Sequence, residues 1–222
     1  VIRRIAARAA CDVYRDELRD GCGPSQFAVG RKAGCEKVHK AITALAAGAP
    51  TDVVLAFDAT NAFNAVPRDK VLQGVAARAP GLLGPAASWL CHPTTHFWWG
   101  AGTAAQEVRA TCGVDQGCPL SPGYFALALA GPLATIEARL RELAPTARVF
   151  SYLDDVMVVL PASVAEQGFD VVKQGLAAAG LTLNEGKTVA WTADPSAQLP
   201  QRLVPFRKLT LRCLGAAAPW VD

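Results

Sequence analysis

The chain has no run of about 18 consecutive apolar residues, the length that a membrane-spanning helix needs. We therefore expect no membrane span, although 51% of the 222 residues are hydrophobic and the mean hydropathy is +0.21. The N-terminal stretch 1–18 carries too many charges for a secretory signal peptide, and it starts with Val1 instead of Met. These features predict an intracellular chain with a sizeable folded core, taken from a longer protein.

The sequence also lacks any C-x-x-C pair, and its seven cysteines are scattered. An odd number without regular spacing fits reduced thiols better than a disulfide framework. Cys91, His92 and His96 lie close together, but without a second cysteine pair their spacing does not match a zinc site. The net charge of +3 is mildly basic and does not by itself indicate a nucleic-acid partner.

Apolar periodicity, broken by glycine and proline, predicts a mixed order of helices and strands. We expect helices over 1–19, 35–47, 67–79, 86–91, 123–143 and 163–179. We expect strands over 52–57, 96–100, 106–111, 149–160, 181–191 and 207–214, with a turn at residues 184–186. Strands that pair antiparallel, with helices packed on one face of the sheet, make an α+β sandwich.

The segment 149–160, VFSYLDDVMVVL, has two apolar runs around Asp154 and Asp155. Such a pattern predicts a β-hairpin with a tight turn. Adjacent carboxylates at the tip of a mostly buried hairpin repel each other, and a divalent cation would offset that repulsion. The alternative is a solvated turn, since Asp is common in turns.

A third acid, Asp58, directly follows the apolar segment 52–57. If this strand and the hairpin are neighbours in one sheet, Asp58 and Asp154 meet at one edge. Carboxylates in that arrangement can hold two divalent ions about 3.5–4 Å apart, which suits in-line phosphoryl transfer. Mg²⁺ is the natural ion for such oxygen ligands, and Mn²⁺ is an alternative.

Four segments in order, FDATNAFNAVPR, GVDQGCPLSP, FSYLDDVMVV and GLTLNEGKT, resemble motifs A, B, C and D of reverse transcriptases. The upstream GPSQFAVGRKAGCEKVHKAI is similar to the stretch before motif A in non-LTR retrotransposon and group II intron enzymes. RKLTLRCLG at 207–215 resembles motif E. The resemblance implies a polymerase palm over residues 51–222 and a partial fingers subdomain over 1–50, without a thumb.

The resemblance also implies roles for single residues. Asp58, Asp154 and, less directly, Asp155 would be the catalytic acids. Asp58, Asp154 and the carbonyl of Ala59 would hold two Mg²⁺ ions. Lys187 matches a motif D lysine that acts on departing pyrophosphate, although a solvated lysine is the alternative.

Further positions match the nucleotide site of the family. Phe63 would lie under the incoming sugar, where a ring excludes the 2′-OH and favours dNTP over NTP. Gln116 and Gly117 would border the nascent base pair. The alternatives are a core role for Phe63 and a plain surface loop for Gln116.

Nucleic-acid contacts are implied at both ends of the chain. Arg31 and Lys32 would touch template phosphates, with a solvated basic loop as the alternative. Leu214 and Gly215 would belong to a hairpin that grips the primer. The aromatic cluster 97–99 is expected to form the core of its hairpin, with base stacking as the other interpretation.

Together these matches predict a nucleotidyltransferase, an RNA-directed DNA polymerase that extends a DNA primer on an RNA template with dNTPs. Two alternatives stay open: a truncated or decayed palm that at most binds nucleic acid, and an RNA-directed RNA polymerase of viral type. The R-P-I signature of the fingers and the thumb are missing, so we expect weak processivity. The oligomeric state does not follow from the sequence.

Overall fold

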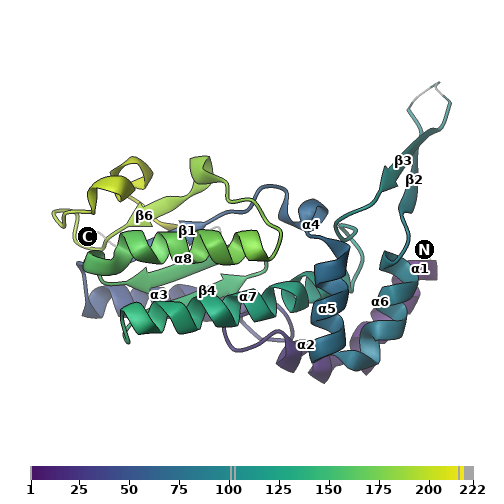
Figure 1. Cartoon of the computed structure of the whole chain (residues 1–222), viewed down its shortest axis with the longest axis horizontal. Helices are drawn as coiled ribbons and strands as arrows, with labels where there is room; N and C mark the ends of the chain where they lie inside the picture. Colours follow the sequence, from purple (N-terminus) through teal and green to yellow (C-terminus); the bar gives the residue numbers. More distant parts are fainter. Residues whose placement is uncertain (1, 101, 103, 215, 218–222) are drawn as a thin grey trace.

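A computed structural model describes residues 2–100, 102, 104–214 and 216–217. Figure 1 shows the helices and strands in this part of the chain. The helices are α1 (Ile2–Val13), α2 (Arg15–Gly21), α3 (Gly34–Gly48), α4 (Ala62–Ala65), α5 (Arg68–Arg78), α6 (Leu83–Leu90), α7 (Ser121–Leu143) and α8 (Ala165–Ala178). The strands are β1 (Val53–Phe57), β2 (Thr94–Trp98), β3 (Gln106–Ala110), β4 (Arg148–Tyr152), β5 (Asp155–Leu160), β6 (Val189–Trp191), β7 (Arg212–Cys213) and β8 (Ala216–Ala217). Short 3₁₀ helices are η1 (Pro80–Leu82), η2 (Ala162–Val164), η3 (Glu185–Lys187) and η4 (Gln201–Phe206).

The main sheet has four strands in the order β4-β5-β1-β6, and all its pairs are antiparallel. The central strand β1 pairs with β5 so that Phe57 lies opposite Val156. The end of β1 therefore lies beside the start of β5, and the condition that the segments 52–57 and 149–160 be neighbours in one sheet is met.

Alternate residues of β1 enter two different cores because side chains of a strand point to opposite faces. Val53, Leu55 and Phe57 belong to the larger core, which also contains most buried side chains of α7 and α8. Val54 belongs to the smaller core, with Val38 and other residues of α3. The prediction of helices on one face is confirmed for α7 and α8, and α3 additionally covers the opposite face (Figure 1).

Helices α2, α5 and α6 lie at one end of α7, beside the sheet (Figure 1). The approach of α5 to α7 is close at Gly74, where an added Cβ would lie 2.5 Å from the carbonyl oxygen of Leu127. A glycine is therefore required there for the two helix backbones to touch. No helix in the described ranges is both long and apolar enough to cross a bilayer.

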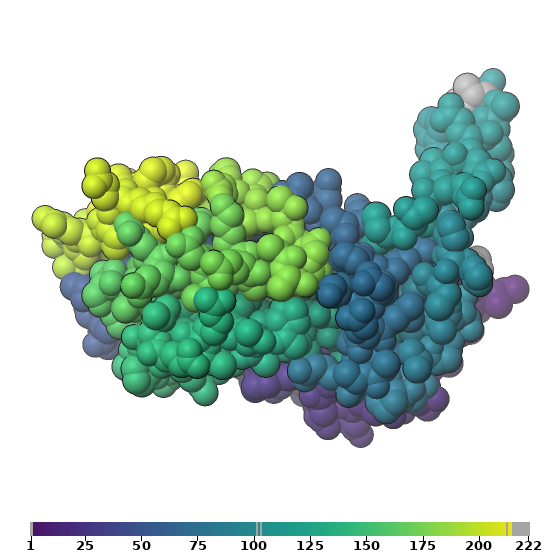
Figure 2. All heavy atoms as spheres, viewed as in Figure 1, coloured from purple at the N-terminus to yellow at the C-terminus, as the bar shows by residue number. Residues whose placement is uncertain are grey.

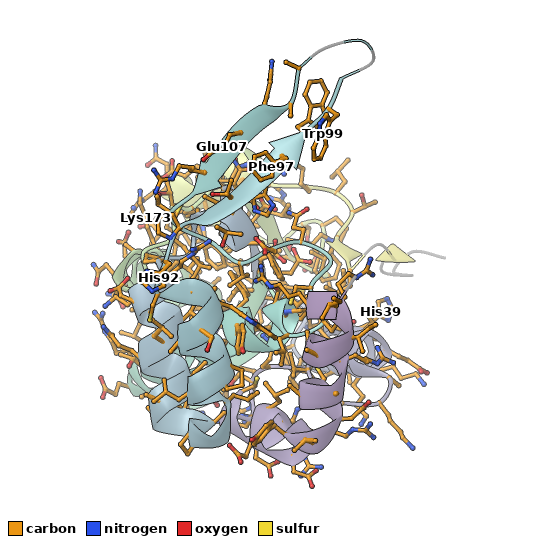
Figure 3. The ribbon with its side chains drawn as sticks, turned by 90° about the vertical axis from the view of Figure 1, so that its right-hand side faces the viewer. His39, His92, Phe97, Trp99, Glu107 and Lys173 are labelled. Carbon is orange, nitrogen blue, oxygen red and sulfur yellow. The ribbon has the colours of Figure 1, made fainter. Side chains whose placement is uncertain are left out.

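The hairpin of β2 and β3 projects from this body as a two-stranded ribbon (Figure 2). Phe97, Trp98 and Trp99 are 56%, 59% and 68% exposed, so the expectation that they form a hairpin core is wrong. A two-stranded ribbon has no second layer to pack against, and its aromatic side chains stay in solvent. Figure 3 shows Phe97 and Trp99 far from the packed helices.

Two predicted strands are shorter in the structure. Within 181–191 only β6 joins the sheet, because Leu183 makes a single bridge to Ala59 and η3 follows. Within 207–214 only β7 is regular, preceded by one parallel bridge between Arg207 and Ala190. The predicted helix 1–19 is divided at Tyr14 into α1 and α2.

Candidate active site

Asp58 lies where the central strand leaves the sheet. Its carbonyl oxygen accepts the N–H of Asn184 at 2.8 Å, and the N–H of Thr60 donates to the carbonyl of Thr182 at 2.8 Å. Ala59 forms the bridge to Leu183 and is buried. The backbone after β1 is thus hydrogen-bonded to the segment that precedes η3, and these bonds fix the position of the Asp58 Cα.

Asp154 and Asp155 lie at the turn between β4 and β5. Tyr152 pairs with Asp155, which leaves Leu153 and Asp154 as the two turn residues. Leu153 has φ +57°, a left-handed conformation that is unusual for a leucine. Since β5 is the neighbour of β1, the predicted meeting of Asp58 with this acidic pair at one sheet edge is found in the structure.

The carboxylates at this edge influence one another electrostatically. Burial first, then the charges of Asp154 and Asp58, raise the pKa of the Asp155 carboxyl to about 6, and Lys187 opposes that rise. Lys187 Nζ lies 3.4 Å from Asp58 Oδ2. Lys187 therefore offsets part of the negative charge, and the charged form of Asp155 is disfavoured unless more positive charge arrives.

The donor set fits a hard divalent cation. Within the described ranges, no three His, Cys, Asp or Glu side chains converge tightly enough to enclose a metal on their own. Mg²⁺ commonly takes one or two carboxylates and completes its shell with water and substrate phosphates. An open edge with Asp58, Asp154 and the Ala59 carbonyl suits a metal that binds together with a phosphorylated substrate.

Phe63, Gln116 and Gly117 lie together, although Phe63 is far from the other two in sequence. They line one side of a cleft of about 460 Å³, which Cys118, Pro119, Ser121 and Pro122 complete. The Phe63 ring stacks on Phe125, with ring centroids 4.6 Å apart, and its carbonyl accepts the N–H of Val114. Gly117 has φ +88°, so the loop itself requires a glycine at this position.

Arg31 and Lys32 line a second cleft, of about 650 Å³, on the other side of Pro119 and Pro122. Arg8 contributes further positive charge to it, while Arg15 and Arg19 also line it but form ion pairs with neighbouring aspartates. Arg31 donates through Nη2 to the Gly23 carbonyl and lies over the Phe27 ring, while its Nε is buried without a hydrogen-bond partner within the described chain. This basic cleft is where the structure places both predicted template contacts.

Leu214 is partly buried against the smaller core and has φ +53°. It lies between β7 and β8, which form a two-stranded hairpin. Gly215, the other predicted primer contact, lies outside the described residues.

Two residues that sequence reasoning missed hold the site together. Gln26 is fully buried and contacts the turn that carries Asp154. Arg68 is buried and donates three hydrogen bonds: to the carbonyls of Gly113 and His92 and to Thr94 Oγ1. Little in the sequence indicated either residue. Gln26 lies in a segment predicted as loop, and Arg68, directly after Pro67, is typical of an exposed residue in the first turn of a helix.

Comparisons with known proteins agree with this geometry. The model of a family described as "Reverse transcriptase (RNA-dependent DNA polymerase)" matches residues 5–217. The chain is 31% identical over 133 residues to the retrotransposable element SLACS 132 kDa protein of Trypanosoma brucei gambiense, covering 59% of this chain and 11% of that protein.

Solved structures of telomerase share the fold. Apo telomerase from Candida tropicalis superposes with a TM-score of 0.65 at 12% identity, over 88% of this chain and 38% of that one. Telomerase from Candida albicans, in complex with a TWJ fragment of telomeric RNA, superposes with a TM-score of 0.65 at 13% identity. The match covers 97% of this chain and 36% of the telomerase chain. At such identity the likeness concerns the fold alone, and it confirms the predicted α+β polymerase palm with partial fingers.

Proposed function

The chain belongs to the reverse transcriptase (RNA-dependent DNA polymerase) family, and we propose that it adds dNTPs to a primer 3′-OH on an RNA template by two-metal phosphoryl transfer. The observation that carries this proposal is the β1–β5 pairing, which brings Asp58 and the Asp154–Asp155 pair to one sheet edge. The chain spans 11% of the length of the curated relative that it matches, so the activity is proposed for this domain within a longer protein.

Asp58, Asp154 and the Ala59 carbonyl are the proposed ligands of two Mg²⁺ ions, and Mn²⁺ can substitute for them. The bound ions supply a lowered pKa for the attacking hydroxyl and neutralise charge on the leaving pyrophosphate. Asp155 shapes the field at the site, because its carboxyl lies close enough to Asp154 and Asp58 for their charges to raise its pKa. Lys187 faces the same edge through Asp58 and is the proposed contact for the leaving pyrophosphate.

The cleft that Phe63, Gln116 and Gly117 line is the proposed dNTP site. Phe63 forms its floor and is held by its stack on Phe125, so that its ring excludes a ribose 2′-OH. Gln116 is exposed at the rim and free to contact the base pair, while Gly117 lets the backbone approach it closely. This position of Phe63 favours DNA over RNA synthesis.

The template and primer are assigned to the two flanks of the site. Arg31 and Lys32, in the basic cleft, bind template phosphates as neutralising cations. Leu214, at the hairpin of β7 and β8, contacts the primer through its backbone. We assign residues 1–50 to partial fingers and 51–222 to the palm, which places the basic cleft mainly in the fingers.

Primer extension on an RNA template with Mg²⁺ or Mn²⁺ tests the proposal. We expect dNTP incorporation that disappears on chelation and falls by at least about 1,000-fold in Asp154→Asn, since its charge directly holds the metal. Asp69→Asn, which changes an exposed carboxylate on α5, is the matched control and keeps full activity.

The alternatives give different results in the same assay. Activity that survives Asp154→Asn contradicts the assignment of the metal site. Salt-dependent RNA binding without incorporation supports a non-catalytic palm. A preference for NTP over dNTP supports an RNA-directed RNA polymerase.

A further inference from the structure

We propose that Gln26 is a positioning residue, which sets the conformation of the turn that carries Asp154 and thereby the position of that carboxylate. The inference rests on the proposed function, because it assigns Gln26 to the same site. Gln26 comes from the segment between α2 and α3 and lies 0% exposed against the end of β4.

Each polar atom of the Gln26 side chain has a partner. Oε1 accepts the backbone N–H of Leu153 at 3.0 Å and that of Ala28 at 3.0 Å. Nε2 donates to Ser151 Oγ at 3.1 Å. One amide thus connects its own loop to two residues of the acidic hairpin, and it does so inside the protein, where hydrogen bonds are strong.

The turn is held from both sides of Leu153. Gln26 Oε1 accepts a hydrogen bond from the N–H of Leu153, and Ser151 Oγ donates to the carbonyl oxygen of Leu153 at 3.0 Å. Because Ser151 also accepts from Gln26, the three residues form a closed network around the residue before Asp154. Both peptide groups that flank the Leu153 Cα are thereby fixed.

The fixed residue is the one under strain. Leu153 adopts φ +57°, and a left-handed conformation is unfavourable for a residue that carries a Cβ. Such a conformation persists only when its surroundings impose it. Gln26 and Ser151 supply the hydrogen bonds that select this conformation over a relaxed turn, in which Asp154 would point elsewhere.

The backbone around Gln26 is itself anchored to the same strand. The N–H of Ser151 donates to the carbonyl of Ser25 at 2.7 Å, and the N–H of Phe27 donates to the carbonyl of Ser151 at 2.8 Å. These bonds place residues 25–27 along the outer side of β4, the end strand of the main sheet. The side chain of Gln26 therefore reaches the turn from a fixed base.

The structure also offers a matched control in the neighbouring residue. Ser25 is buried, but its hydroxyl donates to Glu137 Oε2 on α7 at 2.6 Å, away from the turn. Removing that hydroxyl costs a buried hydrogen bond in the same segment and leaves the contacts of Leu153 in place. A loss of activity shared by the Ser25 and Gln26 variants would indicate that the whole segment is loosened. A loss of activity in the Gln26 variant alone would indicate that the turn at Leu153 has changed.

The test compares Gln26→Met, which keeps the length of the side chain but loses its polar atoms, with Ser25→Ala in the 222-residue chain. Hydrogen exchange at the Leu153 amide is the first measurement, and we expect it to become about tenfold faster in Gln26→Met only. Single-nucleotide incorporation is the second. We expect kcat to fall at least about tenfold, while the dNTP KM changes by less than about threefold, because the metal site is misplaced and the nucleotide cleft is intact.

Ser151→Ala completes the design. In the double variant with Gln26→Met, we expect the kcat loss to be close to that of Gln26→Met alone, since both side chains act on one residue. Unchanged exchange at Leu153, or equal kcat losses in Gln26→Met and Ser25→Ala, would overturn the proposal. Failure of the unchanged chain to incorporate any nucleotide counts against the proposed function, and the exchange of Leu153 then decides the role of Gln26 by itself.

Discussion

Lys187 and Asp58 face each other at the open edge of the main sheet, with Lys187 Nζ 3.4 Å from Asp58 Oδ2. The Lys187 side chain is 68% exposed and that of Asp58 28% exposed, so this ion pair is weak in solvent. A cation held loosely beside a cluster of carboxylates can leave it when a metal ion binds. Lys187 is then free to turn toward a phosphate.

Replacing Lys187 with alanine should therefore affect chemistry and leave folding intact. We expect Lys187→Ala to lower single-nucleotide incorporation by about 100-fold, as for a lost general acid, with an unchanged melting temperature. Lys173→Ala is the control, because Lys173 forms a similar exposed pair with Glu185 at 2.6 Å on η3. Equal losses of nucleotide incorporation in the two variants would mean that Lys187 acts only through its positive charge on the protein surface.

Phe63 should control the choice of sugar. We expect Phe63→Val to raise NTP incorporation relative to dNTP by roughly 10- to 100-fold, since the ring that blocks the 2′-OH is gone. Phe63→Tyr keeps the ring and should keep the selectivity. The measurement is the ratio of kcat/KM for a matched dNTP and NTP pair. Lost stability without a change in that ratio would mean that the stack with Phe125 is structural only.

Gly117 and Gly131 should respond differently to the same substitution. Outside its own stretch of chain, neither glycine has an atom within 4 Å of an added Cβ, but Gly117 has φ +88° while Gly131 lies within α7. We expect Gly117→Ala to lower the free energy of unfolding by about 1–2 kcal/mol because of its backbone conformation. Gly131→Ala should change it by less than about 0.5 kcal/mol, because the gain in helix propensity is offset by crowding of the new Cβ against the ring of Pro132. Urea denaturation of both variants measures the difference.

Arg68 should be important for stability and for the attachment of the β2–β3 hairpin. We expect Arg68→Met to lower the free energy of unfolding by about 2–4 kcal/mol, because the acceptors in Gly113 and His92 lose a buried charged donor. Arg78→Met, on the exposed end of the same helix, should change it by less than about 0.5 kcal/mol. Limited proteolysis near residues 92–94 should accelerate in Arg68→Met alone.

The sequence was informative wherever a short pattern carries its own geometry. An apolar strand that ends in Asp58 and a hairpin with acids at its tip can be recognised locally, and antiparallel pairing then brings them together. The resemblance to the family assigned Phe63, Gln116 and Gly117 to a nucleotide site, and the structure brings the three into one cleft. The acidic hairpin is local in sequence, but its turn at Leu153 and Asp154 contains neither glycine nor proline, so its conformation could not be predicted locally.

The features that the sequence did not predict depend on contacts between residues that are distant in sequence. Gln26 matters because its side chain reaches Leu153, and no periodicity reveals a contact between a loop and a turn. The predicted strand 181–191 was too long because η3 interrupts it after a single bridge between Leu183 and Ala59. The aromatic residues of β2 resembled core by composition, but no layer covers them.

The pairing of β1 with β5 also determines when the site can exist during synthesis of the chain. The strands β1 and β5 are separated by all the elements from α4 to β4, so their contact closes a long loop. Non-local antiparallel pairing of this kind is slow compared with helix formation. A nascent chain that has released only β1 from the ribosome exposes an apolar strand with no partner, and we expect it to need chaperone protection until β5 emerges.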